Sequence, residues 1–275
     1  MSETTSVTAS VPGGSAGAFF AIVARTLSQL LPGRRGLLVL LLFALPVVPA
    51  ILYGGAIPTD QVPSTKLFGS LAMVVYLQLF VPLLAIAFAS GLIADEAERG
   101  TLLFLLTRPV PRPVVVLARA FAYAIASTVP LSLSLLATWG ILCSKPGGTA
   151  LADAVDFPLV VGTAILGALA YGGLFLAVGT WLRKPLLPCL LFAFGWENLL
   201  GNIPGQTRLL SIVHYMRVML SRGAEDAVSH LPMAVPEEGE LSAVAAAIVL
   251  FSIALVGLVT SLRVFSKKAY VLSRI

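Results

Sequence analysis

Ionisable side chains gather in one short stretch of an otherwise apolar chain. Residues 95–113 read DEAERGTLLFLLTRPVPRP, with three carboxylates, three arginines and a Gly-Thr pair in the middle. Carboxylates in the first turn of a helix favour the positive end of its dipole, and Arg99 is placed to pair with Asp95 one turn away. The alternating prolines that follow lack amide donors and force an extended run. The spacing predicts a short helix with an ionic tip and a stiff continuation, which together could transmit force from a partner.

A second group of polar side chains follows the hydrophobic segment 185–200. If that segment enters a membrane, Glu197 lies near its end, and an ionisable group at such a depth is a functional candidate by default. Its carboxylate either contacts a substrate or fixes the helices that follow, by binding their amides or Arg208. His214 and His230 have no thiolate or carboxylate in ligand spacing, which argues against a metal site.

No nucleotide-binding or hydrolytic motif accompanies these groups. The glycine-rich stretches PGGSAG and KPGGTA lack the G-x-x-x-x-G-K-[ST] pattern that cradles phosphates, and neither H-E-x-x-H nor G-x-S-x-G occurs in the sequence. We therefore expect that the chain is not an enzyme and holds no cofactor. Any ATP hydrolysis that drives it has to take place in a separate subunit.

The elements that position these residues are hydrophobic helices. The chain is 58% hydrophobic and 11% charged with a mean hydropathy of +0.96, too apolar for a soluble fold of 275 residues. A spanning helix needs about 20 apolar residues, and five segments qualify. These are 36–57, 67–94, 114–143, 157–182 and 241–262. Segment 185–200 is marginal, so it either spans fully or forms a broken, partly re-entrant helix. The sequence predicts an all-α membrane protein with six transmembrane helices.

The basic residues predict the orientation of these helices. With six spans and the N-terminus inside, 13 of the 18 lysines and arginines fall on the cytoplasmic side, where such residues are enriched. We therefore expect both termini in the cytoplasm. The sequence pI of about 9.5 is then a topology signal, and nucleic-acid binding is not expected.

Two amphipathic segments lie outside the predicted spans. Residues 19–31 form either an N-terminal helix in the cytoplasmic interface or an extension of the first span, and residues 208–222 predict a helix lying flat on the outer interface. Residues 1–18 are small and polar, which predicts a disordered cytoplasmic tail. Residues 19–275 are expected to form a single transmembrane domain.

The charged stretch resembles a known family. It contains the pattern E-x-E-x-G-T-L, then P-x-x-R and a basic residue two turns further on. The matching residues are Glu96, Glu98, Gly100, Thr101, Leu102, Pro109, Arg112 and Arg119. This pattern looks like the coupling segment of ABC type-2 transporter permeases, the ABC-2 membrane-domain family. Arg119 replaces the lysine common at that place, which keeps the charge but alters its geometry.

A second similarity concerns the group around Glu197. The sequence WEN at 196–198 is followed by Arg208, Ser211, His214 and Tyr215. This arrangement resembles a subgroup that includes permeases of copper-site maturation systems. The candidate outer-face residues are therefore Glu197, Asn198, Arg208 and His214.

The resemblance implies a function and a set of partners. In that family the charged segment is a coupling helix docked in a groove of a cytoplasmic ATPase, so Glu96, Glu98 and Arg99 would face the ATPase and Gly100 and Thr101 would shape the turn. The candidate coupling residues are Asp95, Glu96, Glu98, Arg99, Gly100, Thr101, Pro109 and Arg112. The implied protein is the permease subunit of an ATP-driven exporter in a prokaryotic plasma membrane. Its partners would be two ATPase subunits that bind ATP and Mg, and a second permease, a homodimer in the simplest case.

Other interpretations of the sequence stay open. The charged stretch could be a loop that only enforces topology. The chain could be a membrane scaffold or mechanotransmitter that uses the same ATPase without moving a solute. A secondary transporter is a further alternative, although it would need ionisable groups in its spans for ion coupling. The sequence does not identify a substrate, because generic apolar and small residues would line the pathway.

Overall fold

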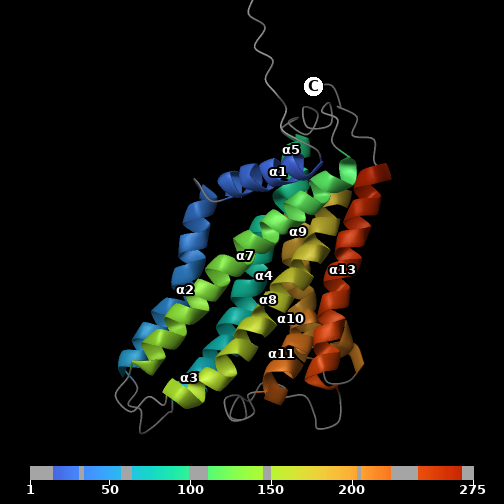
Figure 1. Ribbon diagram of the computed structural model, residues 1–275. Helices are drawn as coiled ribbons and strands as arrows, with labels where there is room; N and C mark the ends of the chain where they lie inside the picture. The colour runs from blue at the N-terminus through green and yellow to red at the C-terminus, as the bar shows by residue number, and fades with distance from the viewer. Residues whose placement is uncertain are drawn as a thin grey trace, which may run out of the picture.

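The computed structural model describes residues 15–30, 34–56, 64–98, 111–144, 150–202, 206–223 and 241–267. Within these ranges the secondary structure is helical and no strand occurs. Figure 1 shows long helices running side by side in an elongated bundle. The class predicted from the hydrophobic segments, an all-α protein with helices suited to a membrane, is confirmed at this level.

The first half of the chain supplies three long helical paths. Its elements are α1 (Ser15–Leu30), α2 (Arg34–Ala56), α3 (Ser64–Leu71), η1 (Ala72–Phe80), α4 (Val81–Ala89), α5 (Gly91–Glu98) and α7 (Arg112–Cys143). The second half adds α8 (Ala150–Trp181), α9 (Leu186–Leu190), η2 (Leu191–Trp196), α10 (Glu197–Asn202), η3 (Gln206–Leu210), α11 (Ile212–Gly223) and α13 (Ala243–Lys267).

Four helical stretches in the described part of the chain are long and apolar enough to cross a membrane. They are Leu67–Ala94, Pro113–Cys143, Phe157–Trp181 and Ala243–Lys267. These stretches agree with four of the predicted spans. Of the other two predicted spans, the first corresponds to α2 (Arg34–Ala56), whose side chains are described over Leu41–Leu52, and the fifth corresponds to the shorter apolar helix Leu186–Trp196. The six-span topology therefore stays a prediction.

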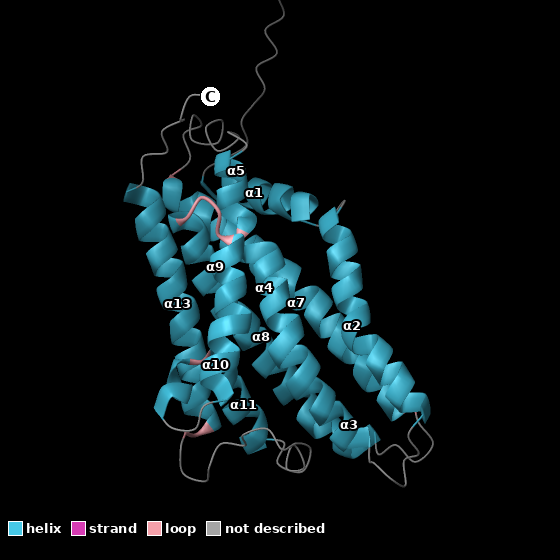
Figure 2. Cartoon of the chain, turned by 180° about the vertical axis from the view of Figure 1, so that it is seen from behind, coloured by secondary structure: helices cyan, strands magenta, loops and turns pink. Residues whose placement is uncertain are grey.

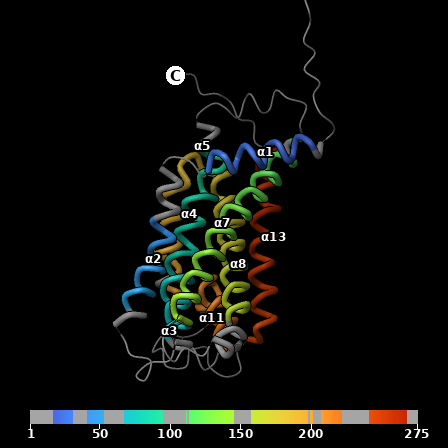
Figure 3. Tube along the Cα trace, turned by 60° about the vertical axis from the view of Figure 1, so that its left-hand side comes forward, coloured from blue at the N-terminus to red at the C-terminus, as the bar shows by residue number. Residues whose placement is uncertain are grey.

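The bundle has two distinct ends. At one end α1 lies across the other helices, and α5 and the C-terminal end of α13 lie at this same end (Figures 1 and 3). At the opposite end lie α3 and α11, with α10 close by (Figure 2). We call these the α5 end and the α11 end. The two groups of candidate residues from the sequence are thus separated along the length of the bundle.

Two stretches of the bundle are wound as π-helix. At the end of η1 the Val81 amide donates to the Tyr76 carbonyl, and at the end of η2 the Glu197 amide donates to the Phe192 carbonyl, both five residues back. Pro82 is the second residue of α4, which follows η1 directly. Because proline lacks an amide donor, a helix in lipid tolerates it when local π-winding supplies partners for the neighbouring carbonyls.

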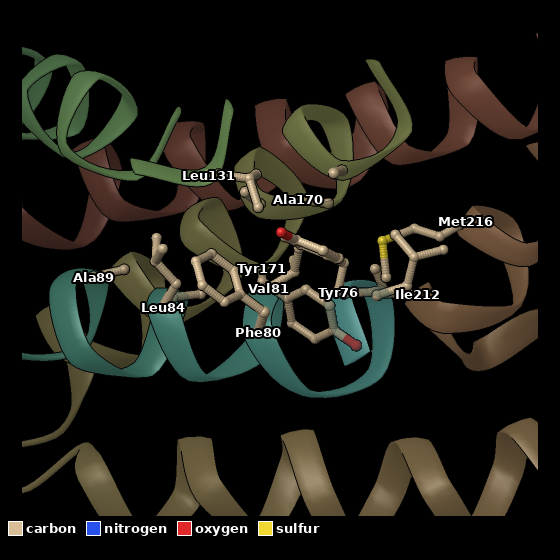
Figure 4. Close-up of a cluster of buried hydrophobic side chains, with 14 of the residues drawn as sticks. Tyr76, Phe80, Val81, Leu84, Ala89, Leu131, Ala170, Tyr171, Ile212 and Met216 are labelled. Atoms are coloured by element: carbon tan, nitrogen blue, oxygen red, sulfur yellow. The ribbon is translucent and has the colours of Figure 1, made fainter. Parts of the chain in front are cut away.

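Helix α8 lies at the centre of the packing. It approaches α13 so closely that a Cβ placed on Gly257 would lie 2.3 Å from the carbonyl carbon of Gly173. On its other side, Tyr171 packs in a buried cluster with Tyr76 and Phe80 from the η1–α4 path and with Met216 from α11 (Figure 4). Small residues on α8 thus allow three neighbours to pack directly against one helix.

The structure corrects two predictions about the amphipathic segments. Helix α1 begins at Ser15, so residues 15–18 belong to a helix and not to the predicted tail. The predicted helix on the outer interface exists as α11, but every side chain from residue 211 to residue 221 is buried. A helix lying flat on an interface would expose its polar face to water. Helix α11 instead packs between α8 and α13, so the interfacial placement was wrong.

Candidate functional site

Helix α5 contains the first part of the predicted coupling segment. It follows α4 after a turn at Ser90 and ends at Glu98, at the end of the bundle crossed by α1 (Figure 2). The sequence predicts Asp95, Glu96 and Glu98 in the first turn of a helix, and that prediction was wrong. The helix begins at Gly91, so the three acidic residues lie in its C-terminal half and gain nothing from the helix dipole.

The structure describes only part of this candidate group. Arg112 begins α7, so the backbone on both sides of the segment is placed. Four candidate residues, Arg99, Gly100, Thr101 and Pro109, lie outside the described residues. The predicted Asp95–Arg99 pair and the predicted turn at Gly100 therefore remain predictions.

Arg119 ties α5 to the neighbouring span. Its side chain is 1% exposed, and its guanidinium Nη1 donates a 2.7 Å hydrogen bond to the carbonyl of Leu92 in α5. Charged donors form stronger hydrogen bonds than neutral ones. Arg119, the basic residue of the family pattern, thus has a defined contact with the coupling segment. It was not among the candidate coupling residues predicted from the sequence.

Helix α1 covers the same part of α7. Val23 is buried in a small cluster with Ala118 and Ala122, which flank Arg119 in the sequence. The ring centroids of Phe19 and Phe121 are 5.8 Å apart. These contacts place α1, α5 and α7 together at one end of the bundle.

At the α11 end, Glu197 caps the start of α11. Its carboxylate accepts hydrogen bonds from the amides of Ile212 and Val213 at 3.0 and 3.2 Å, and from the Ser211 hydroxyl at 2.5 Å. The Ser211 hydroxyl oxygen in turn accepts a bond from the His214 amide at 3.2 Å. The first amides of a helix have no partner within the helix. Glu197 and Ser211 together supply partners for three of them, and the negative charge suits this end of the helix.

Arg217 supplies the positive charge of this cluster. Glu197 and Arg217 are each 3% exposed, and they attract each other electrostatically. The buried Tyr171 hydroxyl lies near enough to interact electrostatically with both. A buried charge is costly unless an opposite charge and hydrogen bonds compensate it. The cluster therefore joins α8, α10 and α11 through compensated charges.

The other outer-face candidates have smaller roles in this geometry. Arg208 is buried in η3, but the partners of the Glu197 carboxylate are the start of α11 and not this arginine. His214 is buried beside Tyr215, with ring centroids 5.5 Å apart. Asn198 follows Glu197 in α10, where only the backbone is described.

Sequence reasoning missed Arg217 and Tyr171. Arg217 lies on the polar face of the predicted interfacial helix, where an arginine reads as water-facing. The available signal was the place of Arg217, about two turns into the helix whose start, at Ser211, contacts Glu197. Tyr171 stands in an apolar run, and nothing in the sequence singles it out. Among the described residues, no group of three or more His, Cys, Asp or Glu side chains is placed to hold a metal ion.

The comparison with known families agrees with this architecture. A family model described as "ABC-2 family transporter protein" matches residues 20–269. The match covers most of the chain, and the chain therefore belongs to the ABC-2 family of transporter permeases. It is a transmembrane component and not itself the catalytic subunit. No curated protein matches the chain.

Proposed function

We propose that this chain is the permease subunit of an ATP-driven exporter, and that a separate cytoplasmic ATPase drives it through α5 and the residues that follow. Membership of the ABC-2 family supports this proposal, because its membrane proteins work in general with ATPase subunits. ATP and Mg would bind to that ATPase. The chain would supply the path through the membrane and the docking segment beneath it.

The observation that carries the proposal is the position of the acidic helix α5. The first four residues of α5 are the last four of the apolar stretch Leu67–Ala94, which includes the turn at Ser90. Asp95, Glu96 and Glu98 therefore lie at the end of a membrane-length helix and outside its apolar part. A rigid element of this kind would pass a push at its tip into the span behind it. An ATPase groove with basic residues would suit its charge.

The proposed arrangement completes the transporter around this contact. The α5 end faces the cytoplasm of a prokaryotic cell, together with both termini, because most lysines and arginines then lie inside. Helix α2 and the α9–α10 region supply the first and fifth of six spans. Two ATPase copies and a second permease, a homodimer in the simplest case, complete the assembly. ATP-driven closure of the ATPases would push α5 and open the path at the α11 end.

Photo-crosslinking tests the coupling contact. A photo-crosslinking amino acid is placed at Glu96 of the full chain, in the membranes of cells that naturally encode this protein. It should capture an ATPase subunit. The double charge reversal Glu96→Lys/Glu98→Lys should abolish capture and ATPase-dependent activity without lowering membrane abundance. Lys267→Glu is the matched control, because it reverses an exposed charge at the same end of the bundle. Capture and activity that survive the double reversal would contradict the proposal.

A further inference from the structure

We propose that Arg119 is a positioning residue for coupling: it holds the junction between α4 and α5, so that a displacement of α5 reaches α7 and α8 together. This inference rests on the proposed function, because it needs an ATPase that moves α5. It goes beyond that function by naming the side chain through which the movement enters the bundle.

The first observation is the bond between Arg119 and Leu92. The guanidinium reaches from α7 to a backbone carbonyl 27 residues earlier in the chain, and Leu92 is the second residue after the Ser90 turn. Leu92 and Arg119 are both buried, so separating the guanidinium from this carbonyl costs the free energy of a buried charged hydrogen bond. The bond therefore resists any movement that separates α5 from α7.

The second observation is independent and comes from α8. A Cβ placed on Gly179 would lie 2.4 Å from the carbonyl oxygen of Ser90. Only glycine lets the α8 backbone approach the turn so closely. The junction is thus held from two sides, by the side chain of Arg119 and by the backbone of α8.

Helix α1 encloses this arrangement. Ala118 and Ala122 flank Arg119 and are buried in a cluster with Val23 of α1. Arg119 itself is 1% exposed, so water is kept from its guanidinium, and a hydrogen bond in a dry environment is stronger than one in water. Arg119 is consequently a stiff connection.

Helix α8 extends this connection to the other end of the bundle. A Cβ placed on its Gly167 would lie 2.0 Å from the Met216 sulfur in α11, and Tyr171 interacts with Glu197. A movement of the α4–α5 junction at Gly179 would thus be passed along α8, through direct packing contacts, to the α11 end.

Hydrogen exchange of the full chain in lipid nanodiscs tests the local part of the inference. Arg119→Met should speed exchange of the α5 amides about tenfold, because it removes a charged hydrogen bond. Arg119→Lys should restore part of the protection. Tyr123→Phe is the matched control, because it breaks a 2.7 Å bond from α7 to the Ala168 carbonyl in α8 and leaves α5 untouched. Unchanged α5 exchange in Arg119→Met would overturn the inference.

The coupling part uses a reporter at the α11 end. In a chain with Cys143 and Cys189 replaced by alanine, a cysteine at the exposed position Leu210 is labelled with a maleimide, with and without ATP and Mg. With wild-type Arg119 we expect nucleotide-dependent labelling. Arg119→Met should keep ATPase capture at Glu96 but lose the nucleotide response, and Arg119→Lys should regain part of it.

Two results of the labelling and capture measurements would also overturn this inference. A full nucleotide response in Arg119→Met would show that coupling bypasses the junction, and lost ATPase capture would show that Arg119 shapes docking. Failure of the proposed function is distinguishable, because a chain with Arg119 intact would then capture no ATPase.

Discussion

The two ends of the bundle each bury a charged side chain, but they compensate it differently. At the α11 end, the Glu197 carboxylate accepts three hydrogen bonds from partners within sixteen residues of it and attracts Arg217. At the α5 end, Arg119 bonds a backbone carbonyl of a separate helix. The first arrangement caps the start of a helix through several bonds to neighbouring residues, whereas the second links two long helices through one side chain. The comparison suggests a rigid unit at the α11 end and a joint at the α5 end through which force can pass.

The largest effect is expected from removing the Glu197 carboxylate. Glu197→Ala takes three hydrogen bonds from the start of α11 and removes a negative charge that attracts Arg217. A buried donor that loses its acceptor costs about 1–3 kcal/mol, so the total loss should be several kcal/mol. We expect a large fall in the thermal unfolding temperature of the purified chain and a low membrane abundance. A variant as stable as wild type would show that the α11 end does not depend on this carboxylate.

Alanine substitutions at two glycines of α8 compare the packing at the two ends of the bundle. A Cβ at Gly179 meets the Ser90 backbone, whereas a Cβ at Gly167 meets the flexible end of Met216. Gly179→Ala should cost about 1–3 kcal/mol, because a backbone carbonyl has to move. Gly167→Ala should cost less, since methionine repacks readily. Thermal unfolding of both variants checks the order.

Gly162→Ala is the control for this pair, because nothing lies within 4 Å of its added Cβ. It should leave the unfolding temperature nearly unchanged. If Gly167→Ala proved the more damaging of the two, the α11 end would be the tighter contact, and the contrast drawn above would be reversed.

The smallest losses of stability are expected from removing either of two hydroxyl groups at the α11 end. Ser211→Ala removes one donor to Glu197 and one acceptor for the His214 amide, which should cost about 1 kcal/mol, as for other helix caps. Tyr171→Phe should cost less than Ser211→Ala, because no hydrogen bond of normal geometry joins the Tyr171 hydroxyl to a neighbour. Unfolding measurements on the two variants test this ranking. A costly Tyr171→Phe would mean that its electrostatic interaction with Glu197 contributes to stability.

The long apolar helices could be predicted from the sequence because length and composition decide whether a helix suits a membrane. The stretch Leu67–Ala94 was predicted with the same bounds. The sequence also offered amide binding as one role of Glu197, and the structure shows those bonds. A contact between this carboxylate and a substrate stays a prediction.

The errors have a common physical origin. An amphipathic pattern shows which face of a helix is polar but not what covers that face. In α11 the polar residues His214 and Arg217 read as water-facing, yet they are buried with the rest of the helix. The start of α5 was missed for a related reason: the acidic residues look like a first helical turn, but the helix already begins at Gly91.

The winding of η1 has a consequence for every residue that follows it. A π-turn holds one residue more than an α-turn, so it offsets the later side chains by roughly 100° around the axis relative to an uninterrupted α-helix. A helical wheel drawn without a break from Leu67 to Ala94 therefore assigns the wrong faces beyond Phe80. The face of this helical path that meets α7 at Leu92 is therefore set several turns earlier, by the π-helical winding of η1.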